Sequence, residues 1–180
     1  LHHASLERIR VSKMAMLHYV DDRPIVLTER GTWEQGSESL HPKVGLLFAA
    51  HIVPTSATDF EVQLGHQRQA VVVRDVGFFV KSLRLERNDM GELTQIVAKI
   101  SDGNEEAVDP STFEQRDDGV FYFRVIRNGF HTRCRLSSAQ YHELALEAEE
   151  TPDGTGFQIG IAAKSWVFGQ SVGPVSIPIQ

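Results

Sequence analysis

The sequence predicts an α+β protein with mostly antiparallel sheets and two main helices, and three observations lead to this class. Short segments that alternate apolar and polar residues recur between turn residues, which is typical of strands with one buried face. Two segments, at about 41–53 and 138–149, carry helical periodicity and helix start signals. Asn128-Gly129 joins two apolar runs, which is the strongest short signal for a tight β-hairpin.

Composition restricts the class of protein. A chain of 180 residues can bury a core without a disulfide or a structural metal. The net charge of −6 argues against a general nucleic-acid-binding protein, which needs a basic footprint. Cys134 is the single cysteine, so it forms no internal disulfide and suits a reducing compartment. No apolar run approaches the ~18 residues that span a bilayer, and the N-terminus lacks a signal-peptide pattern. We therefore expect a cytoplasmic protein without a membrane partner.

The N-terminal half is predicted to hold strands around one helix. Pro42 suits the first helical position, where its missing N–H costs nothing. Apolar residues on every side of the 41–53 segment predict a helix that is buried nearly all round. The segment 31–39 is predicted to be a polar loop around Trp33. Strands are expected at about 24–29, 60–64, 70–73 and 78–86, with a bulge near Ser82, whereas residues 5–20 fit either a helix or a strand.

The C-terminal half repeats this order of strands, one helix and more strands. Ser137 and Gln140 form a capping box at the start of the second helix. Glutamates crowd the end of that helix, where the helix dipole disfavours acids, so a positive partner is expected nearby. We expect two sub-domains with repeated strand–helix motifs, at 1–87 and 92–180, or one compact unit. Further predicted elements are a strand at 94–100, an acidic loop at 101–119 tethered by Val108 and Phe113, strands at 157–162 and 165–168, and an extended tail at 171–180.

The hairpin around Asn128-Gly129 defines one apolar and one cationic face. With a two-residue turn, Arg124 lies opposite Arg133 and Phe123 lies opposite Cys134, and side chains alternate between the faces. The face predicted to be buried comprises Phe121, Phe123, Val125, Thr132, Cys134 and Leu136. The opposite face, called the cationic face below, comprises Tyr122, Arg124, Ile126, His131, Arg133 and Arg135.

The cationic face is the candidate ligand-binding site. Arginines directly opposite in neighbouring strands destabilise the pair by about 0.2–1 kcal/mol if nothing compensates. One interpretation is that acids of the chain itself, at the end of the second helix or at Asp117-Asp118, neutralise this face. The other is an anionic small molecule or an acidic protein segment, because guanidinium groups bind carboxylates and phosphates through paired hydrogen bonds. The candidate ligand-binding residues are Arg124, Arg133, Arg135, Tyr122 and His131.

No catalytic, cofactor or metal site is predicted. The segment 31–36 has the glycine spacing of a phosphate loop, but Ser37 stands where the lysine belongs. His131 and Cys134 are three residues apart in a strand, so they lie on opposite faces and cannot act together. Paired histidines and cysteines with metal-ligand spacing are absent from the sequence.

Several short motifs follow one another in a recognisable order between residues 24 and 168. They are Gly31-Thr32-Trp33 with Gly36, Leu47-Phe48, Val73-Arg74-Asp75-Val76-Gly77-Phe78, Asp102-Gly103, Leu136 with Tyr141-His142-Glu143-Leu144, and Gly160 with Ser165. In this order the chain resembles the uncharacterised bacterial proteins grouped as domain of unknown function 1285. It departs from their pattern at Gln63-Leu64-Gly65-His66, where those proteins continue with a Thr-Pro-Val-Glu stretch.

The resemblance implies a two-part α+β fold with repeated strand–helix motifs and a signalling or regulatory role, without an established activity. It supplies no catalytic residues. Trp33 and Asp75 are matched positions, and each also has a structural explanation, as a loop anchor and a turn cap.

Three functions are consistent with the sequence. The leading hypothesis is a non-enzymatic binding or regulatory protein whose cationic face meets an anionic ligand or an acidic partner. The rival is a hydrolase-like enzyme with a loop-built pocket that uses Asp75, His66 or His142 as acid or base. The third is a structural subunit of a larger assembly, and a homo-oligomer is consistent with each.

Overall fold

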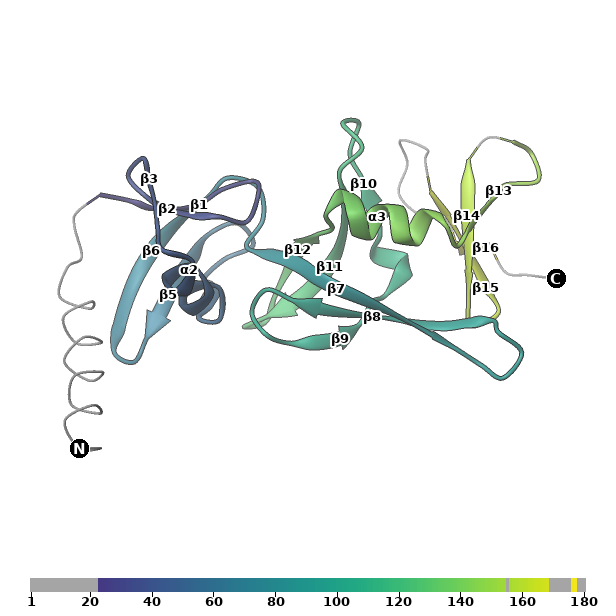
Figure 1. Cartoon of the computed structure of the whole chain (residues 1–180), viewed down its shortest axis with the longest axis horizontal. Coiled ribbons are helices and arrows are strands. Elements are labelled where there is room, and N and C mark those ends of the chain that lie inside the picture. Colours follow the sequence, from purple (N-terminus) through teal and green to yellow (C-terminus); the bar gives the residue numbers. More distant parts are fainter. Residues whose placement is uncertain (1–22, 155, 169–175, 178–180) are drawn as a thin grey trace.

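The described residues form three β-sheets, which follow one another along the length of the molecule (Figure 1). The computed structural model describes residues 23–154, 156–168 and 176–177; the 5–20 segment and most of the 171–180 tail lie outside these ranges. Two helices, α2 (Pro42–Ala49) and α3 (Ser138–Ala145), lie beside the sheets. The predicted α+β class is confirmed.

The N-terminal sheet has the strand order β3-β2-β1-β6-β5-β4. Its two central strands, β1 and β6, pair in parallel, and the other pairs are antiparallel. The segment predicted as a polar loop instead forms β2 and β3, because Trp33 turns inward and packs against Phe48 of α2. The strands are β1 (Ile25–Leu27), β2 (Trp33–Gln35), β3 (Glu38–Ser39), β4 (Ile52–Pro54), β5 (Phe60–Leu64) and β6 (Gln67–Val73).

Helix α2 is shorter and more exposed than predicted. Pro42 stands in its first turn, as expected, but the helix ends at Ala49 and the predicted last turn becomes strand β4. The expected burial on all sides is wrong, since Leu46 is 65% exposed and Leu47 37% exposed. The sheet covers one side of this eight-residue helix, and periodicity alone does not reveal how many sides are covered.

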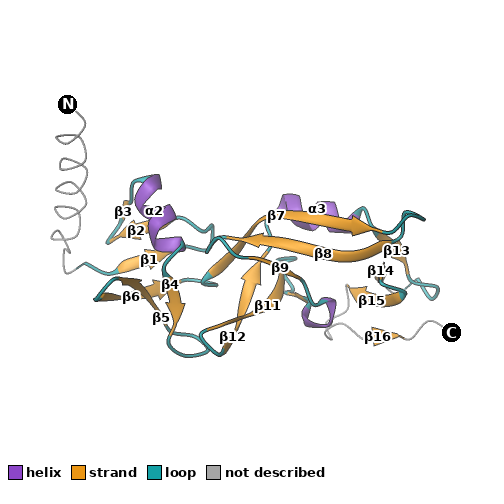
Figure 2. Ribbon diagram, turned by 90° about the horizontal axis from the view of Figure 1, so that it is seen from below, coloured by secondary structure: helices purple, strands orange, loops and turns teal. Residues whose placement is uncertain are grey.

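The central sheet has the order β10-β11-β12-β7-β8-β9 and is dominated by the long β7–β8 hairpin (Figures 1 and 2). A register shift between Val80 and Ser82 confirms the predicted bulge. The predicted acidic loop at 101–119 contains two short strands and a 3₁₀ turn (Pro110–Thr112), and Val108 and Phe113 anchor it in the core. The strands are β7 (Phe78–Arg87), β8 (Leu93–Ile100), β9 (Glu105–Ala107), β10 (Glu114–Gln115), β11 (Phe121–Arg127) and β12 (Phe130–Arg135).

The β11–β12 hairpin has the register that the turn chemistry predicts. Asn128 and Gly129 both have positive φ, 50° and 79°, as a type I′ turn requires. Arg124 pairs with Arg133 across the ladder. The six residues of the predicted apolar face are all buried: Phe121, Phe123, Val125, Thr132, Cys134 and Leu136.

The C-terminal sheet follows helix α3 and has the order β13-β14-β15-β16. The capping box of Ser137 and Gln140 is present, and Gln140 also donates to the backbone of β7, next to α3 (Figure 2). Glu147 meets Arg87 at 2.5 Å, so the positive partner predicted near the helix end is confirmed. The strands are β13 (Ala148–Glu150), β14 (Phe157–Ile161), β15 (Lys164–Phe168) and β16 (Ser176–Ile177).

The order of elements occurs twice in the chain. Each half has a helix of eight residues, then a strand of three residues and one of five, and then a two-residue turn into the next strand. The two copies differ in pairing, because β6 joins β1 in parallel whereas β15 pairs with β16. The division at 1–87 and 92–180 stays a prediction; it falls at the turn between β7 and β8.

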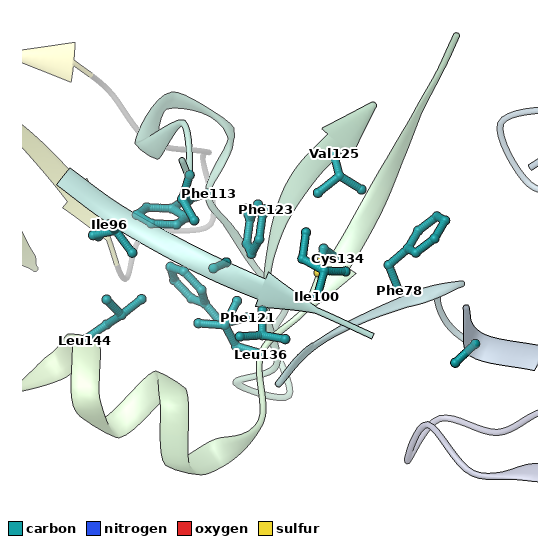
Figure 3. Packing of buried hydrophobic residues seen from close by; sticks show 14 of the residues in the cluster. Phe78, Ile96, Ile100, Phe113, Phe121, Phe123, Val125, Cys134, Leu136 and Leu144 are labelled. Carbon is teal, nitrogen blue, oxygen red and sulfur yellow. The ribbon is translucent and has the colours of Figure 1, made fainter. Parts of the chain in front are cut away.

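One core extends through the central sheet and reaches both neighbouring sheets. Figure 3 shows aromatic rings of β11 packed beside β8 and next to Leu144 of α3. Phe78, at the start of β7, packs edge to face with Phe60 of the N-terminal sheet, with ring centres 6.1 Å apart. The start of β7 is therefore the point where the first two sheets join.

We expect Phe123→Ala to lower the free energy of unfolding by about 3–5 kcal/mol, because it removes a fully buried ring and leaves a cavity. Ile126→Ala, on the same strand but 58% exposed, is the matched control and should change it by less than about 0.5 kcal/mol. Urea unfolding measures both, and equal losses would contradict the assigned faces.

Candidate functional site

The site is built where a four-residue link, 74–77, carries the chain from β6 to β7. The link passes close to the N-terminal sheet: a Cβ on Gly77 would lie 2.4 Å from the ring of Phe60. Only glycine permits this approach. The link therefore brings Asp75 against the β11–β12 hairpin, which pairs with β7 through β12.

Asp75 is held by three donors from the central sheet. Its side chain is 8% exposed. Arg135 donates to its Oδ2 at 2.7 Å, the hydroxyl of Tyr122 lies 3.0 and 3.1 Å from its two oxygens, and Arg116 is 3.3 Å away. Arg116 also donates to the Tyr122 oxygen at 3.0 Å. The charge of a nearly buried carboxylate is thus balanced by two guanidinium groups and a phenol.

Tyr122 is fully buried under the cationic face. Two effects raise the pKa of Tyr122 to about 12: burial, which is the larger, and the hydrogen bond to Asp75. The guanidinium carbons of Arg133 and Arg116 lie 5.7 and 5.9 Å from its ring centre, within cation–π range. Tyr122 therefore supports the arginines and is not itself available to a ligand.

The chain neutralises part of the cationic face chiefly with Glu114 and Asp75, which the sequence did not indicate; Asp118, which it did indicate, adds an electrostatic attraction to Arg135. Arg133 makes a two-point ion pair with Glu114, at 2.5 and 3.1 Å. Arg135 pairs with Asp75, whereas Asp118 pairs with Arg116. The predicted neutralisation by the helix end is wrong, because Glu147 is bound to Arg87 on β7.

Arg124 is different from the other two arginines of the face. Within the described part of the chain it makes no ion pair, and it is exposed. Arg124, His131 and Arg133 line a cleft of about 480 Å³, called the arginine cleft below, between the hairpin and the N-terminal sheet. Its other walls include Thr58, Phe60, Val73, Asp75, Val76 and Glu114.

The far end of the hairpin is tied down by a second ion-pair group. Arg127 donates to Asp102 at 2.6 Å and to Glu106 at 2.9 Å, and lies 5.4 Å from the ring centre of Phe78. Burial alone would raise the pKa of Asp102, but hydrogen bonds from Arg127 and Asn104 lower it overall. The hairpin carrying the cleft is therefore fixed at both ends.

The structure does not assemble the residues of the rival enzyme hypothesis. His66 lies in the β5–β6 turn and His142 on α3, both exposed, and no hydrogen bond joins either to Asp75. The oxygens of Asp75 already accept from three side chains.

Among the described residues no group of three His, Cys, Asp or Glu side chains is placed to hold a metal ion. No described helix has the length and apolar character to cross a bilayer. Burial raises the pKa of the Cys134 thiol, and His131 lies on the opposite face of the sheet.

Comparison with known proteins adds the fold family. No protein-family model and no curated protein matches the chain. A DUF1285 family protein of Shewanella baltica OS155 is similar in structure, with a TM-score of 0.51 and 21% identity over 69% of this chain and 91% of that chain. A DUF1285 family protein of Silicibacter pomeroyi DSS-3 gives a TM-score of 0.59 and 12% identity over 78% of this chain and 76% of that chain. The chain has the fold of DUF1285 proteins. The resemblance to DUF1285 proteins is confirmed at the level of the fold.

Two partners in the site were not identified from the sequence. Arg116 and Glu114 lie in the segment predicted as an acidic loop, where no periodicity assigns a direction to a side chain. Asp75 had a usable signal: it interrupts two strands and is a matched position of the DUF1285 resemblance. Asp102, another matched position, binds the hairpin through Arg127.

We expect Asp75→Ala to lower the free energy of unfolding by about 2–4 kcal/mol, because it leaves a buried phenol and two arginines without their shared acceptor. Glu86→Ala removes an exposed partner of Arg84 and is the control; its loss should be much smaller. Similar losses in urea unfolding would show that Asp75 does not tie the sheets.

Stability should also fall at high pH. Because the folded pKa of Tyr122 is raised to about 12, the contribution of its neutral form is complete below the unfolded pKa of about 10 and is lost as the pH rises through about 12. Tyr122→Phe should flatten this decline between pH 10 and 12. The difference between the tyrosinate absorbance titrations of the two proteins gives the pKa directly, and a value near 10 would contradict the assigned burial.

Proposed function

We propose that this DUF1285-fold protein is a non-enzymatic binding module whose arginine cleft takes a carboxylate group of an anionic ligand or acidic protein segment. The observation that carries the proposal is Arg124, an exposed cation directly opposite Arg133 and without an internal counter-ion in the described chain. Glu114 already balances Arg133 of this like-charge pair, so Arg124 is the member that an added anion would stabilise.

The surroundings of Arg124 favour specific binding of a carboxylate over nonspecific association with ions at the surface. Arg133 is already oriented by Glu114 and by the ring of Tyr122, so little side-chain entropy is lost when a ligand binds. His131 lies beside this pair in the cleft and supplies a further donor. Apolar walls from Phe60, Val73 and Val76 limit competition by water.

A binding role agrees with the regulatory function that the family resemblance implies. The acid–base residues of the enzyme hypothesis lie apart, and the buried carboxylate, Asp75, is committed to structure. No observation on the described residues favours the structural-subunit hypothesis.

Arg124→Ala should weaken binding of citrate and of a hexaglutamate peptide about tenfold, the typical effect of one charge-assisted hydrogen bond of ~1.4 kcal/mol. It should leave the unfolding free energy unchanged or slightly raised, since it removes a like-charge pair. Isothermal titration calorimetry at low and high salt measures the affinity, which should fall with salt. Citrate binding alone identifies a small-molecule site, and peptide binding alone identifies an acidic protein partner.

Arg84→Ala, an exposed arginine of β7 outside the cleft, is the control and should not change either affinity. If Arg124→Ala binds both probes as tightly as the unaltered protein does, the arginine cleft is not the binding site.

A further inference from the structure

Two more clefts adjoin each other around Phe79, the second residue of β7. One, of about 530 Å³, lies between α2 and the start of β7. The other, of about 570 Å³, lies between the β1–β2 turn, β7 and the start of α3. Gly31, Phe79 and Lys81 line both. We call the two together the Phe79 trough.

The two arms of the Phe79 trough differ in chemistry. The arm beside α2 is chiefly apolar and is lined by Leu27, Trp33, Leu40, Leu46 and Ala49. The arm beside α3 carries charged and polar groups, among them Arg30, Lys81, Arg135, Ser137 and Gln140. Clefts of several hundred Å³ with apolar walls and a few polar groups are typical small-molecule sites.

Gly31 keeps the junction between the arms open. Its φ is +76°, and a Cβ there would lie 3.2 Å from the ring of Phe79. Any other residue would be strained in this conformation and would fill the junction. The β1–β2 turn therefore meets the ring without a side chain between them.

The cations at the junction are not used by the fold. Arg30 and Lys81 are exposed and make no ion pair with any residue that the structure describes. Arg135 is bound to Asp75, and Asp118 to Arg116. Glu29 is the remaining acid among the lining residues. Among these lining residues, the two cations without an ion pair, Arg30 and Lys81, therefore outnumber the one such carboxylate, Glu29. All three lie next to the apolar arm.

The apolar arm opens to solvent beside Leu46. Leu46 lines it and is 65% exposed. An apolar body lying along this arm would remove Leu46 from water, which is favourable by about 25 cal/mol per Å² of apolar surface.

We propose that the Phe79 trough binds an amphipathic carboxylate, with its apolar chain in the arm beside α2 and its carboxylate at Lys81 and Arg30. This site has its own cations, because Arg124, His131 and Arg133 line neither arm; Gly77 is shared by the apolar arm and the arginine cleft. Charge complementarity at Lys81 selects an anionic head, and the volume of the apolar arm selects a chain of small-molecule size.

Calorimetric titration with decanoate, below its micelle concentration, tests the proposal with the complete chain. Decanoate should bind at least about tenfold more tightly than decanol, which lacks the charge, and than acetate, which lacks the chain. Lys81→Met should weaken decanoate about three- to tenfold and leave decanol unchanged. Leu46→Ser should weaken both, and because Leu46 is exposed, folding should not be affected.

Matched controls separate this site from other effects. Lys99→Met changes an exposed strand lysine outside the trough, and Leu146→Ser changes a leucine that is 73% exposed; neither should alter decanoate affinity. Arg124→Ala should also leave it unchanged, so that failure of the arginine cleft and of the Phe79 trough are distinguishable. Absence of saturable decanoate binding, or an unchanged affinity in Lys81→Met, would overturn the proposal.

Discussion

The ion pair between Asp75 and Arg135, with the Tyr122 hydroxyl, is the interaction on which the rest of the structure depends. A link of four residues joins the N-terminal and central sheets, and a link this short fixes the sheets only if it is itself fixed. A carboxylate that is 8% exposed would be costly without partners, and two donors from the hairpin, Tyr122 and Arg135, together with Arg116 from the preceding loop, offset that cost. The same hydrogen bonds occupy Arg135 and hold Tyr122 in a buried position, so neither residue of the cationic face is available to bind a ligand.

Fixing the hairpin at both ends gives it a defined position over the neighbouring clefts. Asp75 holds Arg135 at one end and Asp102 holds Arg127 at the other, while Asn128 donates to the Pro54 carbonyl of the N-terminal sheet at 3.1 Å. The arginine cleft is formed between these contacts. Of its cations, Arg133 is preorganised by Glu114 and the Tyr122 ring, which reduces the entropy lost on binding an anion.

Local chemistry explains which features could be predicted from the sequence. Asn128-Gly129 determines a type I′ turn, and that turn determines the full register, the buried face and the opposed Arg124–Arg133 pair. Ser137 and Gln140 determine the start of α3 in the same way. In both cases the residues that carry the signal lie within a few positions of the turn or helix start that they determine.

The remaining features depend on contacts between distant segments. Asp75 and Arg135 are 60 residues apart, and a charged residue in a loop does not indicate its partner. Trp33 has no local signal for burial, since its position depends on Phe48 in α2. The apolar surface of α2 indicates that the helix needs covering, but the number of sides that the sheet covers is a property of the tertiary fold.

The most direct test of a cationic face that is only partly neutralised is NMR of the arginine Nε–H resonances during a citrate titration. We expect the Arg124 resonance to shift most along the binding curve and that of Arg133, whose Nε–H already donates to Glu114, to shift less, while those of Arg127 and Arg135, held by Asp102 and Asp75, stay in place. Equal shifts at all four arginines, or displacement of Arg135 alone, would contradict this division of the face between structure and binding.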